Sequence, residues 1–419
     1  MLQAFKMMRE LAILLAALCA VYGDSATYGM HLDRHVVPAN YTGIPGVDPE
    51  ANMKFCQISV YHGYACEEYL HEVVTKDGFL LTMHRITGRK KKLISDRRPV
   101  FLQHGLLCDS TSWILNLPNQ TLPFLIADAG FDVWLANSRG NTYSMAHQTL
   151  KPHQEEFWAW SWDEMAMYDL PASVDFVLNK TGHNKLHYVG YSQGTLIGFV
   201  HLGNTRNDKF VEMIALAPVF QLAHMEGILS ILSPAAKDIY FVLKLLGIHD
   251  FLPNLEVIKI LGDTVCNEND PVHEICGYIL QSFAGIDTKQ FNESRLPVYL
   301  GHAPAGTSVR NMMHFVQMYD SKVCSRYDYG SPAKNVLHYG TPVPPAYNLS
   351  AITHTPVSLY YGGHDWLADP KDVNYILSHL KTIQRSEYIP GWDHLDFLWA
   401  MDATSKLYNS VIEELLLNP

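Results

Sequence analysis

The stretch Leu186-His-Tyr-Val-Gly-Tyr-Ser-Gln-Gly-Thr-Leu-Ile-Gly-Phe199 decides the fold. Its first six residues are a short apolar run that predicts a buried strand, and the residues from Thr195 onward predict a helix. Between them lies Gly190-Tyr-Ser-Gln-Gly194, a G-x-S-x-G pentapeptide. At a sharp strand-to-helix turn, the two glycines remove Cβ atoms where chain segments approach closely, and the serine hydroxyl is lifted above the sheet. In this context the motif predicts that Ser192 is a nucleophile, whereas the pentapeptide alone also arises by chance.

The composition is typical of a globular protein. The chain has 419 residues, 48% of them hydrophobic and 17% charged, with a net charge of −11. This size fits one large α/β domain with an insertion, or two domains. The acidic balance argues against a nucleic-acid partner. No cofactor and no metal site is indicated, because neither a zinc-ligand spacing nor a phosphate-binding glycine loop occurs.

The N-terminus predicts a secretory signal peptide over residues 1–23. Two basic residues, Lys6 and Arg9, precede an apolar core at 11–21 and a small residue, Gly23. About eleven apolar residues are too few to span a bilayer, so no transmembrane anchor is expected. The mature protein is therefore expected to be soluble and to follow the secretory pathway, to the lysosome or the extracellular fluid.

Two further sequence features agree with that route. Five N-glycosylation sequons occur, at Asn40, Asn119, Asn179, Asn292 and Asn348. Six cysteines lie beyond the predicted signal peptide, and an oxidising compartment permits disulfides among them. Cys266 with Cys276 closes a short loop, and Cys56 with Cys66 is possible by the same logic. Because six cysteines allow 15 pairings, these remain candidates.

The order of apolar runs predicts an α/β fold with a mostly parallel sheet. A β-hairpin is expected over 68–85 with its turn at 76–78, a helix over 163–178 and a final helix over 397–417. Further strands are expected at 99–103, 131–136, 186–191, 213–217, 357–362 and 387–390. Residues 222–348 contain helical apolar stretches without strand alternation and predict an inserted cap domain. The core is thus expected in two parts, 24–221 and 349–419.

A nucleophilic serine needs a histidine base and an orienting carboxylate. On sheets with this serine turn, the acid and then the histidine follow the serine, each after a late strand. Four late acids are candidates: Asp365, Asp369, Asp393 and Asp396. Asp365 directly follows the strand at 357–361 in a glycine-rich loop, whereas Asp369 precedes a proline and is typical of a helix N-cap. His394 follows the last strand and satisfies the position expected of the base; four other late histidines, His338, His354, His364 and His379, do not.

Hydrolysis by a serine nucleophile also needs an oxyanion hole. One donor is expected to be the backbone N–H of Gln193, directly after the nucleophile. The second is expected from the loop His104-Gly-Leu-Leu107, where the glycine permits close approach and the Leu106 N–H is the chosen donor.

Several motifs together resemble the acid lipase family, the group of gastric and lysosomal acid lipases and their insect relatives. They are Leu102-Gln-His-Gly-Leu-Leu107, Ala136-Asn-Ser-Arg-Gly-Asn141, Gly190-Tyr-Ser-Gln-Gly194, His302-Ala-Pro-Ala-Gly-Thr-Ser308, Gly363-His-Asp-Trp-Leu-Ala-Asp-Pro370 and His394-Leu-Asp-Phe-Leu-Trp-Ala-Met-Asp402. The resemblance covers roughly residues 61–407.

This resemblance implies an α/β-hydrolase fold with a cap and a mobile lid, and a serine lipase acting on long-chain carboxylic esters at an oil–water interface. It implies Ser192 as nucleophile, Asp365 as acid, His394 as base, and the N–H groups of Leu106 and Gln193 as the oxyanion hole. Cys266–Cys276 matches the cap disulfide of the family, although one extra residue separates the pair here. The other four cysteines are not explained by its better-known members.

Two other functions stay open at this stage. One is a serine peptidase or small-ester hydrolase on the same fold, since a fold does not fix a substrate. The other is a non-catalytic lipid carrier or storage protein on a lipase scaffold, which a complete set of serine, acid and histidine disfavours. The sequence leaves open whether triacylglycerols, cholesteryl esters or phospholipids are preferred.

Overall fold

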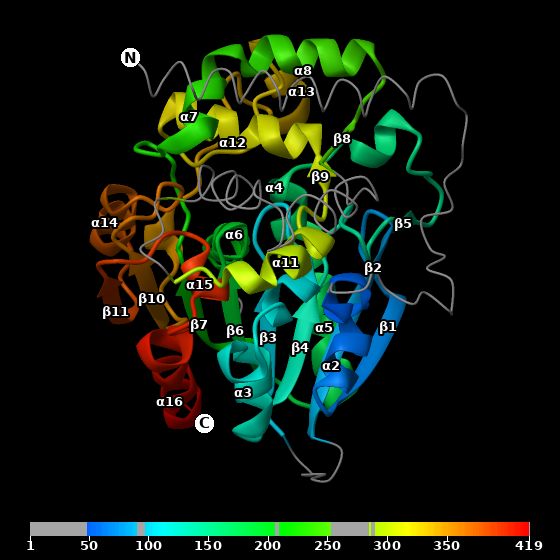
Figure 1. The fold of residues 1–419 in the computed structure, drawn as a ribbon. Coiled ribbons are helices and arrows are strands. Elements are labelled where there is room, and N and C mark those ends of the chain that lie inside the picture. The colour runs from blue at the N-terminus through cyan, green and yellow to red at the C-terminus, as the bar shows by residue number, and fades with distance from the viewer. Residues whose placement is uncertain (1–47, 90–96, 206–208, 253–284, 286–289, 419) are drawn as a thin grey trace, which may run out of the picture. The chain divides into compact units, whose positions relative to one another are not determined.

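A twisted sheet carries the fold, and most of its strands run parallel (Figure 1). The computed structural model describes residues 48–89, 97–205, 209–252, 285 and 290–418. Within these residues the strands are β1 (Tyr64–Val74), β2 (Phe79–Arg89), β3 (Pro99–Gln103), β4 (Asp132–Ala136), β5 (Ala146–His147), β6 (Leu186–Tyr191), β7 (Phe210–Leu216), β8 (Asp250–Phe251), β9 (Thr307–Ser308), β10 (Val357–Gly362) and β11 (Ile383–Ile389). The predicted signal peptide, Asn40 and the Cys266–Cys276 pair lie outside the described residues and stay predictions.

The strand order in the large sheet is β1-β2-β4-β3-β6-β7-β10-β11, with β5 paired to β2. From β4 to β11 neighbouring strands are parallel, whereas β1 and β2 form an antiparallel hairpin that also pairs antiparallel with β4. The hairpin prediction is therefore confirmed, with the turn at 75–78. Every residue of β3, β4 and β6 is buried, as expected for central strands covered on both faces.

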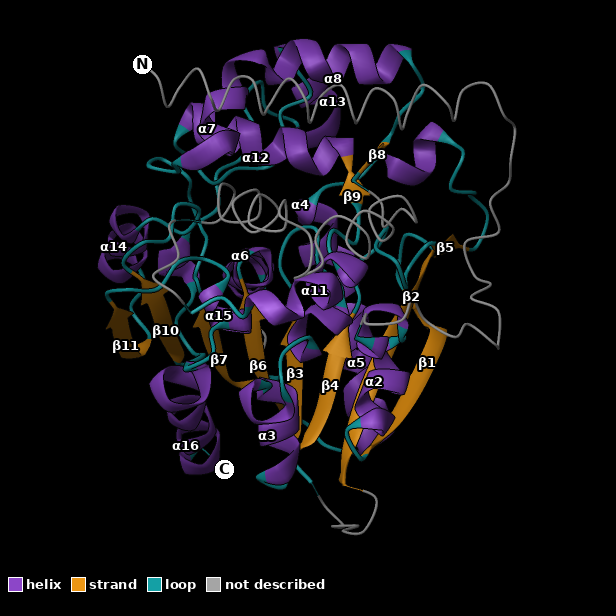
Figure 2. Cartoon of the chain, viewed as in Figure 1, coloured by secondary structure: helices purple, strands orange, loops and turns teal. Residues whose placement is uncertain are grey.

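Helices cover both faces of this sheet (Figure 2). The helices of the described ranges are α2 (Phe55–Tyr61), α3 (Leu122–Asp128), α4 (Trp162–Glu164), α5 (Leu170–Thr181), α6 (Gln193–Asn204), α7 (Gly227–Leu232), α8 (Ala236–Leu245), α11 (Leu296–His302), α12 (Val309–Ser321), α13 (Pro332–Tyr339), α14 (Pro370–His379), α15 (Asp396–Trp399) and α16 (Asn409–Leu417). Helices α3 and α16 lie in front of the sheet in this view, while α7, α8, α12 and α13 lie beyond one end of its strands. No helix in the described ranges is long and apolar enough to cross a membrane.

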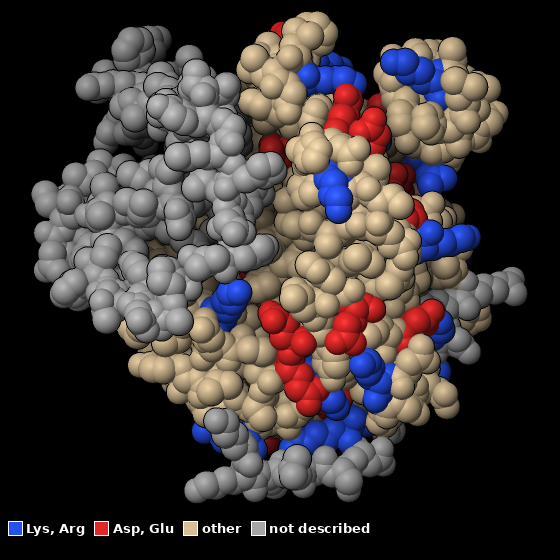
Figure 3. Space-filling view, turned by 90° about the vertical axis from the view of Figure 1, so that its right-hand side faces the viewer, with Lys and Arg blue, Asp and Glu red and all other residues tan. Residues whose placement is uncertain are grey.

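The edge strand β1 carries the acidic side chains Glu67, Glu68 and Glu72, and basic side chains of neighbouring elements pair with two of them. Arg85 on β2 pairs with Glu67 on β1 (3.0 Å), and Lys180 pairs with Glu72 (3.3 Å). Figure 3 views this side of the molecule and shows acidic and basic side chains next to each other. Charges on an edge strand oppose pairing with a second chain, so this edge is protected against aggregation.

Two predicted elements differ from the structure. The expected single helix over 397–417 is interrupted, because Ala400 is extended and bridges to Phe291 while the Met401 N–H donates to the Gln290 carbonyl (3.0 Å). The region 222–348 was expected to hold no strands, yet β8 and β9 form a two-residue antiparallel pair. Both differences depend on partners distant in the sequence, which no local pattern reports. The cap boundaries themselves stay a prediction.

The structure also places the candidate modification sites within its described range. Cys56 at the start of α2 is bonded to Cys66 on β1, so that pairing is confirmed, and Cys108 and Cys324 are free thiols. Asn119, Asn179 and Asn348 are exposed, and Asn292 is partly buried. Glycosylation at these positions remains a prediction.

Candidate active site

The serine turn joins β6 to α6 in a strained conformation. Ser192 has φ 54° and ψ −120°, a backbone region that residues with a Cβ rarely adopt. A Cβ on Gly194 would lie 2.3 Å from the carbonyl oxygen of Gln103, and one on Gly190 would lie 2.9 Å from the Gly194 carbonyl group. The expectation that both flanking glycines are sterically required is therefore confirmed.

Three side chains from three loops meet at this turn. The His394 Nε2 lies 2.7 Å from the Ser192 hydroxyl oxygen, and its Nδ1 lies 2.8 Å and 3.0 Å from the two carboxylate oxygens of Asp365. All three residues are buried. Because a carboxylate can only accept, Nδ1 carries the hydrogen and Nε2 is left to accept the serine proton.

The surrounding backbone fixes the acid and the base. The N–H groups of Leu367 (2.9 Å) and Ala368 (2.7 Å) donate to Oδ1 of Asp365. The Tyr191 hydroxyl, from the residue before the serine, donates to the His394 carbonyl oxygen (2.9 Å). The loop that carries the base is thus tied directly to the serine turn.

The other acid and histidine candidates have different surroundings. The Asp369 side chain accepts from the Lys371 N–H and caps α14, as predicted. Asp393 accepts from the N–H of Leu395 and Asp396, within its own loop. The alternative histidines His338, His354, His364 and His379 are all exposed. Only Asp365 and His394, among these described candidates, are brought into contact with Ser192.

Both expected oxyanion donors come from segments next to Ser192. Gln193 is the first residue of α6, so its N–H belongs to the helix N-terminus, where backbone donors point outward. A Cβ on Gly105, the residue before Leu106, would lie 3.0 Å from the Ser192 Cβ. The loop that carries Leu106 therefore approaches the serine as closely as a glycine permits.

His104 holds the Gly105 loop through both ring nitrogens. Its Nε2 accepts from the Ser138 N–H (3.0 Å), so its Nδ1 carries the hydrogen and donates to the Gly105 carbonyl (2.8 Å). Burial lowers the pKa of His104 to about 4, which keeps the ring neutral near neutral pH. The sequence marked His104 and Ser138 only as parts of motifs and gave them no role.

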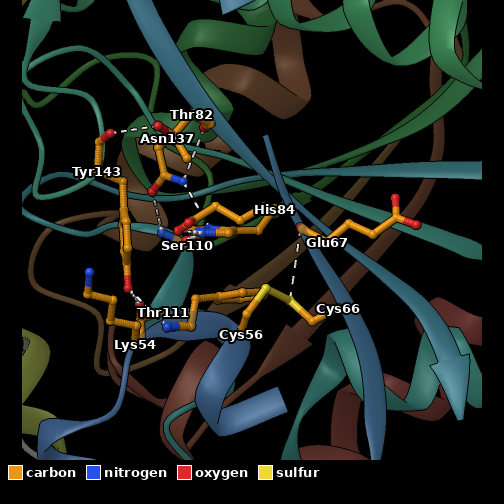
Figure 4. Close-up of polar contacts among 12 residues, drawn as sticks. Lys54, Cys56, Cys66, Glu67, Thr82, His84, Ser110, Thr111, Asn137 and Tyr143 are labelled. Atoms are coloured by element: carbon orange, nitrogen blue, oxygen red, sulfur yellow. Dashed lines mark hydrogen bonds and ion pairs between the residues drawn. A yellow bond between two sulfur atoms is a disulfide. The ribbon is translucent and has the colours of Figure 1, made fainter. Parts of the chain in front are cut away.

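A second buried network fixes the same loop farther along (Figure 4). The Asn137 side-chain oxygen accepts from the Ser110 N–H (3.0 Å), and the Ser110 hydroxyl lies 2.7 Å from Nδ1 of His84. The other ring nitrogen of His84 contacts Glu68 (3.1 Å). Ser110 and His84 are fully buried and Glu68 is exposed, and their contacts tie the loop after β3 to β1 and β2.

Comparisons with known proteins agree with this fold. The family described as "Partial alpha/beta-hydrolase lipase region" matches residues 55–117, and "alpha/beta hydrolase fold" matches residues 98–249. The lysosomal acid lipase/cholesteryl ester hydrolase of Homo sapiens is 46% identical over 379 residues, covering 88% of this chain and 92% of the relative. The gastric triacylglycerol lipase of Mus musculus is 45% identical over 370 residues, covering 87% and 92%.

Solved structures of low sequence identity share the fold. A candidate lipase from Sulfolobus solfataricus aligns with a TM-score of 0.52 at 13% identity, covering 81% of this chain and 90% of the other. The hypothetical protein PA2218 from Pseudomonas aeruginosa also gives 0.52, at 11% identity, covering 85% and 94%. The α/β-hydrolase prediction is thereby confirmed.

Proposed function

The chain belongs to the acid lipase family of α/β-hydrolases, and on that premise we propose that it hydrolyses carboxylic ester bonds of neutral lipids through an acyl-enzyme on Ser192. The observation that carries this proposal is the continuous contact from Asp365 through His394 to the Ser192 hydroxyl. The names of the relatives favour triacylglycerols and cholesteryl esters as substrates.

Ser192, His394 and Asp365 each have a chemical role in the proposed reaction. His394 accepts the Ser192 proton as the hydroxyl oxygen attacks the ester carbonyl, and Asp365 stabilises the imidazolium that forms. His394 then returns the proton to the departing alcohol. A water molecule, deprotonated by the same histidine, releases the fatty acid from the acyl-enzyme.

The oxyanion of each tetrahedral intermediate is proposed to lie between the N–H groups of Leu106 and Gln193. The close approach of Gly105 to Ser192 and the position of Gln193 at the start of α6 support this assignment. Losing one such donor typically lowers kcat by about two to three orders of magnitude, so the positions of both loops matter for the rate.

Contact with an oil–water interface is proposed through α8, the outermost helix in Figure 1. None of its described residues is buried, and its apolar side chains Phe241 and Leu245 are 62% and 70% exposed. These residues are four apart and share one face of the helix. Burial of such side chains against lipid is favourable, which supports a peripheral lipid contact.

The secretory pathway, ending in the lysosome or outside the cell, is the proposed location. The Cys56–Cys66 disulfide supports an oxidising compartment, and the relatives include a lysosomal and a gastric lipase.

The test is fatty-acid release from emulsified trioleoylglycerol and from cholesteryl oleate by the purified protein between pH 4 and 8. Ser192→Ala should remove all release while retaining the fold by circular dichroism. An inert wild type that still binds lipid would contradict the proposal and favour the carrier function. Activity on soluble esters or peptides alone, with none on the emulsions, would favour a small-ester hydrolase or peptidase.

A further inference from the structure

The amide side chain that follows the nucleophile is hydrogen-bonded to a distant helix. Gln193 and Asn311 on α12 are both buried, and the Asn311 Nδ2 lies 2.8 Å from the Gln193 Oε1. The two residues are 118 positions apart. Gln193 contributes a proposed oxyanion donor with its backbone, so its side chain offers a second means of holding that donor in place.

The hydrogen-bond pattern fixes the orientation of both amides. The Trp162 backbone N–H lies 2.7 Å from the Asn311 Oδ1 and can only donate, so the oxygen of Asn311 must face it. The nitrogen of Asn311 therefore faces Gln193, which must present its oxygen. The Gln193 nitrogen then points toward the sulfur of Met165 (3.5 Å). If the Asn311 amide were flipped, its nitrogen would face the Trp162 N–H, another donor, and if the Gln193 amide were flipped, its nitrogen would face the Asn311 nitrogen.

Helix α12 is itself held firmly against residues 159–162, the segment that leads into α4. Four successive residues of that segment contact the start of α12: Ala159 with Arg310 (2.7 Å), Trp160 with Ser308 (2.6 Å), Ser161 with His314 (2.9 Å) and Trp162 with Asn311 (2.7 Å). Asn311 is thus a fixed point from which Gln193 can be positioned.

The support that Asn311 gives to Gln193 bears on the proposed reaction because Gln193 belongs to the serine turn. Because Ser192 has a positive φ, the turn keeps its shape only while its surroundings hold it. A small rotation of the peptide between Ser192 and Gln193 would redirect the Gln193 N–H away from the oxyanion. Misplacement of a catalytic group by about 1 Å can lower the rate by about a hundredfold.

We propose that Asn311 is a positioning residue for the ester-hydrolysis reaction, acting through the Gln193 side chain on the backbone N–H that stabilises the oxyanion. The inference rests on the proposed function, because it assumes that Ser192 and Gln193 work as assigned there. Asn311 itself does not contact the reacting atoms.

The test compares kcat and KM of purified variants on soluble p-nitrophenyl butyrate. Asn311→Ala should lower kcat about tenfold to a hundredfold with KM changed less than about twofold, because the contact matters in the transition state. Gln193→Met removes the acceptor and leaves α12 untouched, so it should give a similar loss even if Asn311→Ala folds poorly. Gln193→Glu retains an acceptor for Asn311 and should recover much of kcat.

A matched control separates positioning from stability. Thr307→Val removes the other partner of the Asn311 nitrogen, at 3.0 Å, without touching Gln193. It should lower the melting temperature while kcat stays within about twofold of wild type. The double variant Asn311→Ala/Gln193→Met should lose no more than either single change, because both remove one contact.

Two results would overturn the inference: a wild-type kcat in Gln193→Met, or equal losses of kcat in Asn311→Ala and Thr307→Val. Failure of the proposed function is distinguishable, because it would show as a wild type that hydrolyses no ester or as a fully active Ser192→Ala.

Discussion

Helices α8 and α12 both belong to the region predicted as a cap, yet they use their surfaces in opposite ways. On α8 the apolar side chains are exposed, with Leu246 at its end 68% exposed. On α12 polar side chains are buried, and Asn311 and His314 make hydrogen bonds into the hydrolase core. The comparison favours the two proposals made above, that α8 meets an apolar surface and that α12 supports the serine turn.

The largest effect on stability is expected when the buried contacts of α12 are removed. His314→Ala removes a hydrogen bond to Ser161 (2.9 Å), another to the Ser325 carbonyl (2.9 Å) and a ring stack on Trp162 at 4.0 Å. Two buried polar groups lose their partner, so the free energy of unfolding should fall by about 3–4 kcal/mol. Urea denaturation measures this.

The matched control for His314→Ala is Leu246→Ala beside α8. This leucine is exposed, so its truncation should change the free energy of unfolding by less than about 0.5 kcal/mol. Equal losses in the two variants would show that the helices do not differ in their attachment.

The next largest effect is expected on emulsion hydrolysis, when exposed apolar side chains of α8 are replaced. Phe241→Ser together with Leu245→Ser should lower activity on emulsified trioleoylglycerol about tenfold to a hundredfold at limiting interface, because about 2–3 kcal/mol of apolar burial against lipid is lost. Hydrolysis of p-nitrophenyl butyrate in solution should be unchanged. Leu337→Ser on α13 is a comparably exposed leucine elsewhere and serves as control. A parallel fall on both substrates would place α8 in the catalytic machinery instead.

A smaller effect is expected in the pH dependence of stability, because α12 carries the buried histidine His314. Burial lowers the pKa of His314 to about 4, with Glu164 and Arg326 as its charged neighbours. A histidine whose pKa is lowered on folding contributes full stability above about pH 6.5, and this is lost as pH falls toward 4, because the unfolded chain then binds the proton more readily.

Between pH 7 and 5, wild type should therefore lose about 1–2 kcal/mol more than His314→Gln, measured by urea denaturation at each pH. Burial also lowers the pKa values of His104 and His201 to about 4. Because these two histidines remain in the variant, its free energy of unfolding should still decrease with falling pH, but less steeply than that of wild type. Identical slopes in the two proteins would contradict a buried, neutral His314.

The smallest effect is expected at the ion pair that links α8 to the core. Lys244 lies 2.9 Å from Glu155, and both side chains are about half exposed. Exposed pairs contribute little, so Lys244→Met should change the free energy of unfolding by less than about 0.5 kcal/mol. A thermal scan in low and high salt checks this, and a large loss would mean that α8 is held to the core as firmly as α12.

The positions of Ser192, Asp365 and His394 could be predicted because each lies in the turn or loop that follows a strand with a readable apolar pattern. The glycines around the serine turn carried a local steric signal in the same way. These features depend on residues that are neighbours in the chain.

Asn311 had no such signal. Its proposed role depends on a contact with Gln193 more than a hundred residues away, which no local pattern in the sequence reports. The break after Trp399 was missed for the same reason, because Gln290 and Phe291 supply the partners that end the helix. The pairing of Cys56 with Cys66 was weighed only as a possibility, since sequence spacing does not show that their Cα atoms lie 5.3 Å apart.

The run of bonds between residues 159–162 and the start of α12 also determines how this enzyme can be recombined with its relatives. A chimera that exchanged residues 222–348 as one block would set a foreign α12 against a native partner segment. Crossovers placed before Thr307, so that Ser308, Asn311 and His314 travel with the hydrolase core, retain every one of these bonds. The part of the region before Thr307 can then be exchanged while the serine turn keeps its original support.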